Sequence, residues 1–253
     1  MYYTNQGDLH EAYIQELQSL ANVTLINAQD YIHPDRAASI GGWSVKPFAM
    51  LVSKFKEIIF IDADGLFFQD PATLFDWDSY KHTGSLYFRD RTIGAGDTSA
   101  LDFFKSMVSR PSDFAKQQRM WRKLSQHEGE SGVIAMDKSR GGFFVLLMAS
   151  LMNMDPIKDQ MYKKIHGDKE SYWMASEALQ VPYSWGPGAG GTVGFLNPDR
   201  NASVCGGLYH VDENWDPLWF NGGVIMNKHS EKGQQVFNLT HWAVDKTYKN
   251  MIW

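Results

Sequence analysis

The chain contains a single cysteine, Cys205, among its 253 residues. One thiol excludes an internal disulfide framework and a zinc site built from several thiolates. Long hydrophobic segments are also missing, because the longest apolar run, residues 143–152, is shorter than the roughly 20 residues of a membrane-spanning helix. We expect that run to form a buried helix. Residues 1–8 contain neither a basic nor an apolar stretch, so we expect no secretory signal in this chain.

Positive charge is in short supply as well. The chain has 24 Lys+Arg against 29 Asp+Glu, a formal net charge of -5, so it lacks the basic surface with which proteins hold a phosphate backbone. We therefore expect no nucleic-acid partner. A hydrophobic content of 43 % is enough for a proper core, and no repeat or linker interrupts the chain. The sequence predicts one domain over residues 1–253.

Hydrophobic periodicity predicts an α/β protein. A helical pattern after Gly7 and a strand at 23–26 read as the second half of a β-α-β unit, whose first strand lies before Met1 or is reduced to residues 1–3. Two apolar runs, at 58–61 and 132–136, predict buried central strands. Helices are expected at 47–55, 103–124, 143–154, 162–179 and 234–248, a glycine-rich loop at 186–194, and short strands at 208–211 and 219–220.

The sharpest chemical feature is Asp62-Ala63-Asp64, directly after the predicted strand at 58–61. Ligands of open α/β sheets bind beyond the carboxyl ends of the strands, so both carboxylates are expected to face that crevice. Carboxylate oxygens without sulfur or histidine beside them suit Mn²⁺ or Mg²⁺ bridging a substrate diphosphate. The plain alternative is a pair of acidic residues that ends a strand and begins a turn.

A phosphatase motif is a second interpretation of the same residues. The stretch 60–65 is similar to the start of haloacid-dehalogenase-type phosphatases, in which the first aspartate is a nucleophile. Here Leu66 stands where that family has Thr or Val, and the stretch before Asp168 is too polar for the family's later strand. We rank this interpretation below a nucleotide-sugar site.

Five strings in a fixed order carry a more specific resemblance. They are KPFAMLVS at 46–53, DP at 70–71, TGSLYFRDR at 83–91, ESG at 130–132 followed by DKSR at 137–140, and GDKESYWMA at 167–175. Together they resemble the fungal-type Golgi α-mannosyltransferases, which build mannan and glycoprotein side chains. The match runs from about residue 42 to residue 227.

The resemblance implies a GT-A-type glycosyltransferase fold, a Rossmann-like mixed sheet flanked by helices. It also implies a GDP-mannose donor, Mn²⁺ (with Mg²⁺ as a substitute), and transfer with retention to a mannose-terminated glycan of a glycoprotein or polysaccharide. Asp62 and Asp64 would hold the metal on the donor diphosphate, and Lys46 would lie near the nucleotide. The family is Golgi-lumenal and type II membrane-anchored, and this chain shows no such anchor.

Three acidic residues match positions expected to face the donor sugar and acceptor. Glu130, followed by Ser131 and Gly132, could orient the acceptor hydroxyl or stabilise a developing oxocarbenium charge, at a corner where a missing side chain lets a sugar approach the backbone. Asp168 and Glu170 fall where many GT-A enzymes place an acidic pair at a helix start. The alternative for Glu130 is an exposed loop carboxylate. The alternative for Asp168 and Glu170 is that they merely complement the dipole of a helix.

The third metal ligand and a tail contact rest on the resemblance alone. His210 is the candidate for the histidine that GT-A enzymes often supply near the C-terminus, and its alternative is a structural histidine. Asn221 stands where the family tends to place a His or Asn, and is a poorer Mn²⁺ ligand. Lys228 would contact the diphosphate from the tail.

We therefore expect a retaining α-mannosyltransferase. The nearest rival is a transferase of the same fold that uses a UDP-sugar, because a D-x-D motif serves any nucleotide diphosphate. A rival of another class is a non-catalytic glycan-binding domain, in which Trp185, Trp215 and Trp219 stack sugars. Its glycan affinity would be indifferent to Mn²⁺.

Overall fold

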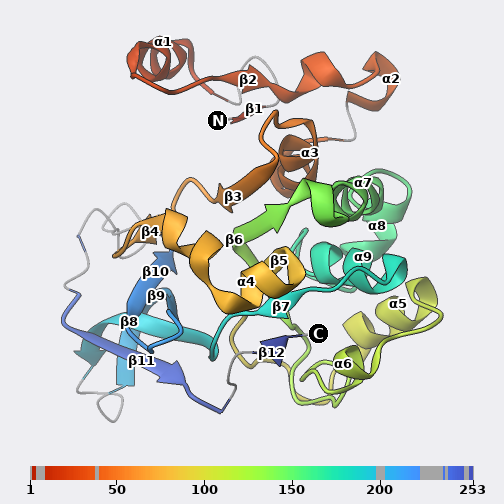
Figure 1. The fold of residues 1–253 in the computed structure, drawn as a ribbon, viewed down its shortest axis with the longest axis vertical. Coiled ribbons are helices and arrows are strands. Elements are labelled where there is room, and N and C mark those ends of the chain that lie inside the picture. The colour runs from red at the N-terminus through yellow and green to blue at the C-terminus, as the bar shows by residue number, and fades with distance from the viewer. Residues whose placement is uncertain are drawn as a thin grey trace.

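One five-stranded sheet carries the predicted catalytic strings. The computed structural model describes residues 2–3, 9–37, 40–197, 203–222, 236, 239–247 and 251–252. Within these residues the strand order is β12-β7-β5-β6-β3 (Figure 1). The strands are β3 (Glu57–Ile61), β5 (Ser85–Arg89), β6 (Gly129–Asp137), β7 (Ser184–Trp185) and β12 (Met251–Ile252). The β5–β7 pair is parallel and the others are antiparallel, so the sheet is mixed.

The expectation of two central strands is right for β6 and wrong for β3. β6 lies between β5 and β3, and nearly all of it is buried. β3 is the edge strand among the described strands and is largely half-buried. A short apolar run does not distinguish a central strand from an edge strand, because strand order depends on partners far away in the sequence.

Alternating residues of the sheet pack into two hydrophobic cores, one on each face. Tyr87 and Ile134 face a core formed with the helices α3 (Val45–Val52), α5 (Ser99–Met107), α6 (Asp113–Lys116), α7 (Gly142–Met152), α8 (Ile157–Met161) and α9 (Ser171–Leu179). Leu86, Phe88 and Val133 face the opposite core. That core is closed by η3 (Pro71–Asp76), α4 (Asp78–Thr83) and the second sheet. The period of two along each strand produces this division.

Helix α7 is only partly buried. Val145 and Leu146 lie in the core, whereas Phe144 is 61 % exposed and Leu147 and Leu151 are also exposed. The prediction of a buried helix was therefore wrong for one of its faces. The run has no polar face for a periodicity argument to recognise.

A second sheet, with the order β11-β8-β9-β10-β4 among the described strands, packs beside the first (Figure 1). Its strands are β4 (Leu66–Phe67), β8 (Ala189–Asn197), β9 (Ser203–Val211), β10 (Pro217–Asn221) and β11 (His241–Asp245). The short strands expected at 208–211 and 219–220 are confirmed within β9 and β10. β4 follows β3 almost directly, so the Asp62-Ala63-Asp64 turn joins the two sheets.

Two predictions fail in this sheet. The glycine-rich stretch expected as a loop contains the first part of β8, where strands approach so closely that a Cβ on Gly194 would lie 1.9 Å from the carbonyl oxygen of Cys205. Glycine is used here for close backbone approach. The helix expected at 234–248 is replaced in its middle by β11, which pairs Trp242 with Val193. Much of the rest of that segment lies outside the described residues.

The N-terminal segment forms a small β-α-β unit, as expected, but the strand expected at 23–26 is shifted to Ile26–Asn27. β1 (Tyr2–Tyr3) pairs in parallel with β2 (Ile26–Asn27), and α1 (Glu11–Ser19) connects them. In the described residues these strands form their own sheet instead of extending the one that holds β3. η1 (Ala28–Tyr31), α2 (Pro34–Ala37) and η2 (Gly42–Ser44) then lead to α3. None of the described helices is long and apolar enough to cross a membrane.

Candidate active site

Four polar side chains from separate elements meet at the carboxyl end of β3. The Nζ of Lys46 on α3 donates to Asp62 Oδ2 at 2.7 Å and to Ser131 Oγ at 3.4 Å. It also lies 3.8 Å from Asp168 Oδ1, and Ser131 Oγ donates to that oxygen at 3.2 Å. We call Lys46, Asp62, Ser131 and Asp168 the lysine–carboxylate cluster. The sequence predicted all four as site residues, and the structure brings them into mutual contact.

The cluster carries more negative than positive charge. Burial raises the pKa of Asp62, and the Asp168 and Asp64 carboxylates add to the rise, whereas Lys46 opposes it. Burial also raises the pKa of Asp168 against the effect of Lys46. Burial by itself lowers the pKa of Lys46, but Asp168 and Asp62 raise it above its usual value, so the amine is charged. Asp62, Asp168 and the neighbouring Asp64 thus place more carboxylates than ammonium groups at this turn, which favours the uptake of a further cation.

The donor atoms at this turn suit a hard divalent ion. Asp62 and Asp64 offer only carboxylate oxygens, and the turn is fixed by hydrogen bonds from Asp62 N to Gly132 O and from Gly65 N to Asp62 O. Oxygen ligands are those preferred by Mn²⁺ and Mg²⁺. No group of three or more His, Cys, Asp or Glu side chains able to hold a metal occurs among the described residues.

His210 lies elsewhere, in the core between the sheets. It is 1 % exposed, its ring stacks on Trp219 at 4.3 Å, and Phe88 meets it edge-on at 5.2 Å. Burial lowers its pKa to about 3, so the ring is neutral. These contacts are those of a structural histidine, and metal ligation by His210 stays a prediction that they do not favour. Lys228 lies outside the described residues.

Glu130 is held beside the cluster by a folded-back conformation. Its Oε1 accepts from the backbone N–H of Gly132 at 2.9 Å and from Asn221 Nδ2 at 3.3 Å. Burial raises the pKa of Glu130 to about 7, and the Asp90 carboxylate adds to the rise. Asn221, considered as a metal ligand from the sequence, thus connects β10 to Glu130. A carboxyl group that titrates near neutrality can hold or release a proton at working pH.

Replacing Gly132 with alanine is expected to destabilise the protein by about 1–3 kcal/mol through overpacking. The added methyl group would lie 2.8 Å from Asn221 Nδ2 and 2.9 Å from Glu130 Oε1. Chemical denaturation measures the loss. Gly41→Ala is the matched control, since a Cβ there meets nothing within 4 Å. Equal stability of the two variants would contradict the expected overpacking and would show that the ends of the Asn221 and Glu130 side chains move aside at little cost.

Glu170 is completely buried, and protein donors occupy its carboxylate. It accepts from the backbone N–H groups of Glu128 at 3.0 Å and Gly129 at 3.1 Å, and from Trp173 Nε1 at 2.6 Å. These bonds hold the first residues of β6 against the start of α9. The structure therefore favours a supporting role over the catalytic one expected from the sequence.

A second buried charge network, which no sequence pattern indicated, lies next to Glu130. Lys169 Nζ donates to Asp90 Oδ2 at 2.6 Å, which lowers the pKa of Asp90 despite its burial. Arg119 Nε donates to Glu128 Oε1 at 3.1 Å, and Arg89 Nε lies 3.3 Å from the same oxygen. Most of these residues lie within the family strings, so their positions were visible but their pairing was not. The network fixes the beginning of β6 and the end of β5.

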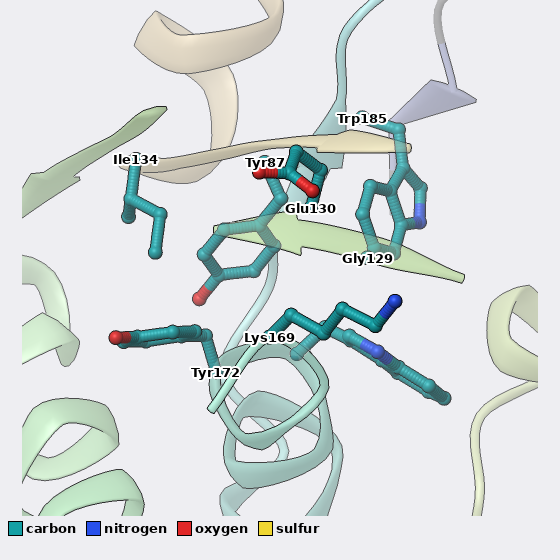
Figure 2. A pocket seen from close by; sticks show the side chains of 8 residues that line it. Tyr87, Gly129, Glu130, Ile134, Lys169, Tyr172 and Trp185 are labelled. Carbon is teal, nitrogen blue, oxygen red and sulfur yellow. The ribbon is translucent and has the colours of Figure 1, made fainter. Parts of the chain in front are cut away.

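A narrow gap lies alongside Glu130 and Lys169 (Figure 2). Tyr87, Tyr172 and Trp185 form part of its lining. Tyr172 donates its hydroxyl to Asp168 Oδ2 at 2.7 Å. The gap therefore adjoins the lysine–carboxylate cluster through the Tyr172 side chain, and aromatic rings make up much of its lining.

Comparison with known proteins shows the family to which the chain belongs. Residues 1–212 match a protein family described as "Mannosyltransferase putative". The chain belongs to this mannosyltransferase family. The resemblance carried by the five strings is thereby confirmed.

Individual relatives agree with that assignment. Over 94 % of its length the chain is 26 % identical to "Putative alpha-1,3-mannosyltransferase MNN14" of Candida albicans, and over 81 % it is 29 % identical to "Putative alpha-1,3-mannosyltransferase MNN15" of the same organism. Over 75 % it is 25 % identical to "Alpha-1,3-mannosyltransferase MNT3" of Saccharomyces cerevisiae. The chain spans 39 %, 30 % and 35 % of the lengths of these three proteins.

Proposed function

We propose that this protein is a retaining α-mannosyltransferase that moves mannose from GDP-mannose to a mannose-terminated glycan. The observation that carries the proposal is the lysine–carboxylate cluster, in which Lys46 and two carboxylates meet at the carboxyl end of β3. Family membership supplies the sugar, and relatives named as α-1,3-mannosyltransferases suggest the linkage. The two-sheet α/β architecture is consistent with a GT-A fold, which we include in the proposal.

Asp62 and Asp64 would hold Mn²⁺, with Mg²⁺ as a substitute. The excess of carboxylates over cations at the cluster supports this assignment. When bound, the ion would neutralise charge that develops on the leaving diphosphate. Lys46 would add a second positive charge on the same side, held in place by Asp168.

Asp168 and Glu130 have different proposed roles. Asp168 is buried and engaged by Lys46, Ser131 and Tyr172, so it positions the lysine. Glu130 is the better candidate to touch the reacting hydroxyl, because burial gives it a pKa of about 7. In a retaining transfer it would orient that hydroxyl or stabilise the positive charge on the sugar.

The elevated pKa of Glu130 has a measurable effect on stability. The folded protein disfavours the charged carboxylate, so its contribution to stability is complete below pH 4.5 and is lost as the pH rises through about 7. Glu130→Gln keeps the shape without the charge. We expect the variant to gain roughly 2–3 kcal/mol relative to the wild type between pH 5 and pH 8. Urea unfolding of both proteins in EDTA tests this, and a difference independent of pH would contradict it.

Calorimetric titration of nucleotide sugars tests the proposed function. We expect GDP-mannose to bind in the presence of Mn²⁺ and to bind far more weakly in EDTA. UDP-glucose and UDP-galactose serve as controls for the base and the sugar. Preference for a UDP-sugar would move the assignment to another transferase, and binding of glycan without any nucleotide sugar would favour a non-catalytic domain.

The cellular setting is part of the same proposal. We infer a Golgi-lumenal enzyme that acts on glycoprotein or polysaccharide acceptors, as the sequence resemblance implies, with a membrane anchor in the full-length form. The resemblance of the five strings to Golgi α-mannosyltransferases supports this setting. Localisation of the tagged full-length protein in its native cells is the measurement that checks it.

A further inference from the structure

Trp43 is half exposed directly beside the lysine–carboxylate cluster. It belongs to η2, three residues before Lys46, and 50 % of its surface is accessible. Three residues correspond to about one turn, or roughly 5 Å along a helix axis. Segment 166–168 also links Trp43 to the cluster, since Gly167 packs on Trp43 and Asp168 lies 3.8 Å from Lys46.

The indole of Trp43 is firmly held. A Cβ on Gly167 would lie 2.9 Å from both Cδ2 and Cε3 of the indole, so only glycine allows this close contact. His166 lies 4.9 Å from the indole, ring centre to ring centre, and Tyr162 meets it edge-on at 6.3 Å. These contacts hold the indole in place, while half of the surface of Trp43 stays accessible.

Hydrogen bonds tie this support to the cluster. Tyr162 donates to Asn153 Oδ1 at 2.7 Å, and Asn153 Nδ2 donates to Ser171 Oγ at 2.9 Å. Ser171 Oγ in turn donates to the backbone carbonyl of Asp168 at 2.6 Å. The indole and the Asp168 backbone therefore keep a fixed relation. A rigid aromatic surface next to carboxylates is suited to a ligand with one apolar face and several hydroxyl groups.

We propose that Trp43 is a stacking platform for a hexopyranose ring at the reaction centre. This inference rests on the proposed function. The hexose of a sugar nucleotide is bonded directly to the β-phosphate, whereas the base is separated from it by ribose and the α-phosphate. A ring one helical turn from Lys46 is therefore the donor hexose or the acceptor hexose that meets it. The shared chemistry is the apolar face of a pyranose.

The test compares Trp43→Ala and Trp43→Phe with Trp242→Ala. Trp242 is a matched control because it is 44 % exposed and lies on β11 of the other sheet. Calorimetry measures the affinities for GDP, GDP-mannose and an oligomannoside, with Mn²⁺ present. We expect Trp43→Ala to weaken at least one of the two mannose-containing ligands about tenfold and GDP less than twofold. Trp43→Phe should retain most of the affinity, and Trp242→Ala all of it.

The outcomes separate the possible sources of the ring. A loss confined to GDP-mannose assigns the platform to the donor hexose, and a loss confined to the oligomannoside assigns it to the acceptor. An equal loss for GDP and GDP-mannose would mean that Trp43 stacks the base, which overturns the inference, as would unchanged affinities. If the wild type binds oligomannoside through Trp43 but no GDP-mannose, the proposed function fails and the platform stands. If the wild type binds neither ligand, both fail.

Discussion

Asp62→Asn is expected to lower mannosyl transfer by about a thousandfold. The substitution keeps the size of the side chain but removes the negative charge that pairs with Lys46 at 2.7 Å and would hold the metal. A metal ion in such a site supplies several kcal/mol of charge stabilisation, and each 1.4 kcal/mol corresponds to a tenfold change in rate. Product formation from GDP-mannose at saturating Mn²⁺ measures the loss, with circular dichroism to confirm folding.

Two further variants sharpen this result. Asp64→Asn should act in the same direction, because Asp64 is the other carboxylate of the turn. Asp76→Asn is the control, since its side chain is 85 % exposed and its contact with Lys81 is a surface ion pair. If Asp62→Asn kept more than a tenth of the activity with an unchanged Mn²⁺ requirement, the metal assignment would be wrong.

Glu170→Ala is expected to lower the melting temperature by about 10–20 °C. The substitution leaves the N–H groups of Glu128, Gly129 and Trp173 without their acceptor in a fully buried place. Each buried donor without a partner costs about 1–3 kcal/mol, and 1 kcal/mol shifts the melting temperature of a chain of this size by about 2–4 °C. Thermal unfolding followed by circular dichroism measures the shift.

The same experiment separates structural support from catalysis. Glu16→Ala, at an exposed position of α1, should change stability by less than about 0.5 kcal/mol. Loss of activity by Glu170→Ala at an unchanged melting temperature would return Glu170 to the catalytic role expected from the sequence. A lower melting temperature of Glu170→Ala would confirm that the carboxylate supports the first residues of β6.

Local features were predicted well where neighbouring residues determine them. The run before Asp62 forms β3, and the run from Gly132 lies within the central strand β6, because four or five consecutive apolar residues bounded by turn residues specify a strand locally. The strings that surround these strands were enough to indicate the family. Predictions failed where long-range contacts override local pattern, as in β8, where neighbouring strands make room only for glycine.

The sequence by itself determined the α/β class, the carboxylates at the end of β3, and the family. Only the tertiary structure decided which side chains meet. Lys46 and Asp62 are 16 residues apart, Ser131 and Asp168 are 37 apart, and Glu130 and Asn221 are 91 apart. The tertiary structure also gives two carboxylates that are close in sequence different surroundings: Asp168 lies beside Lys46, and Glu170 is buried among N–H donors. The reason is physical: the role of a carboxylate depends on which charges and N–H groups surround it, and chain folding brings these from distant positions.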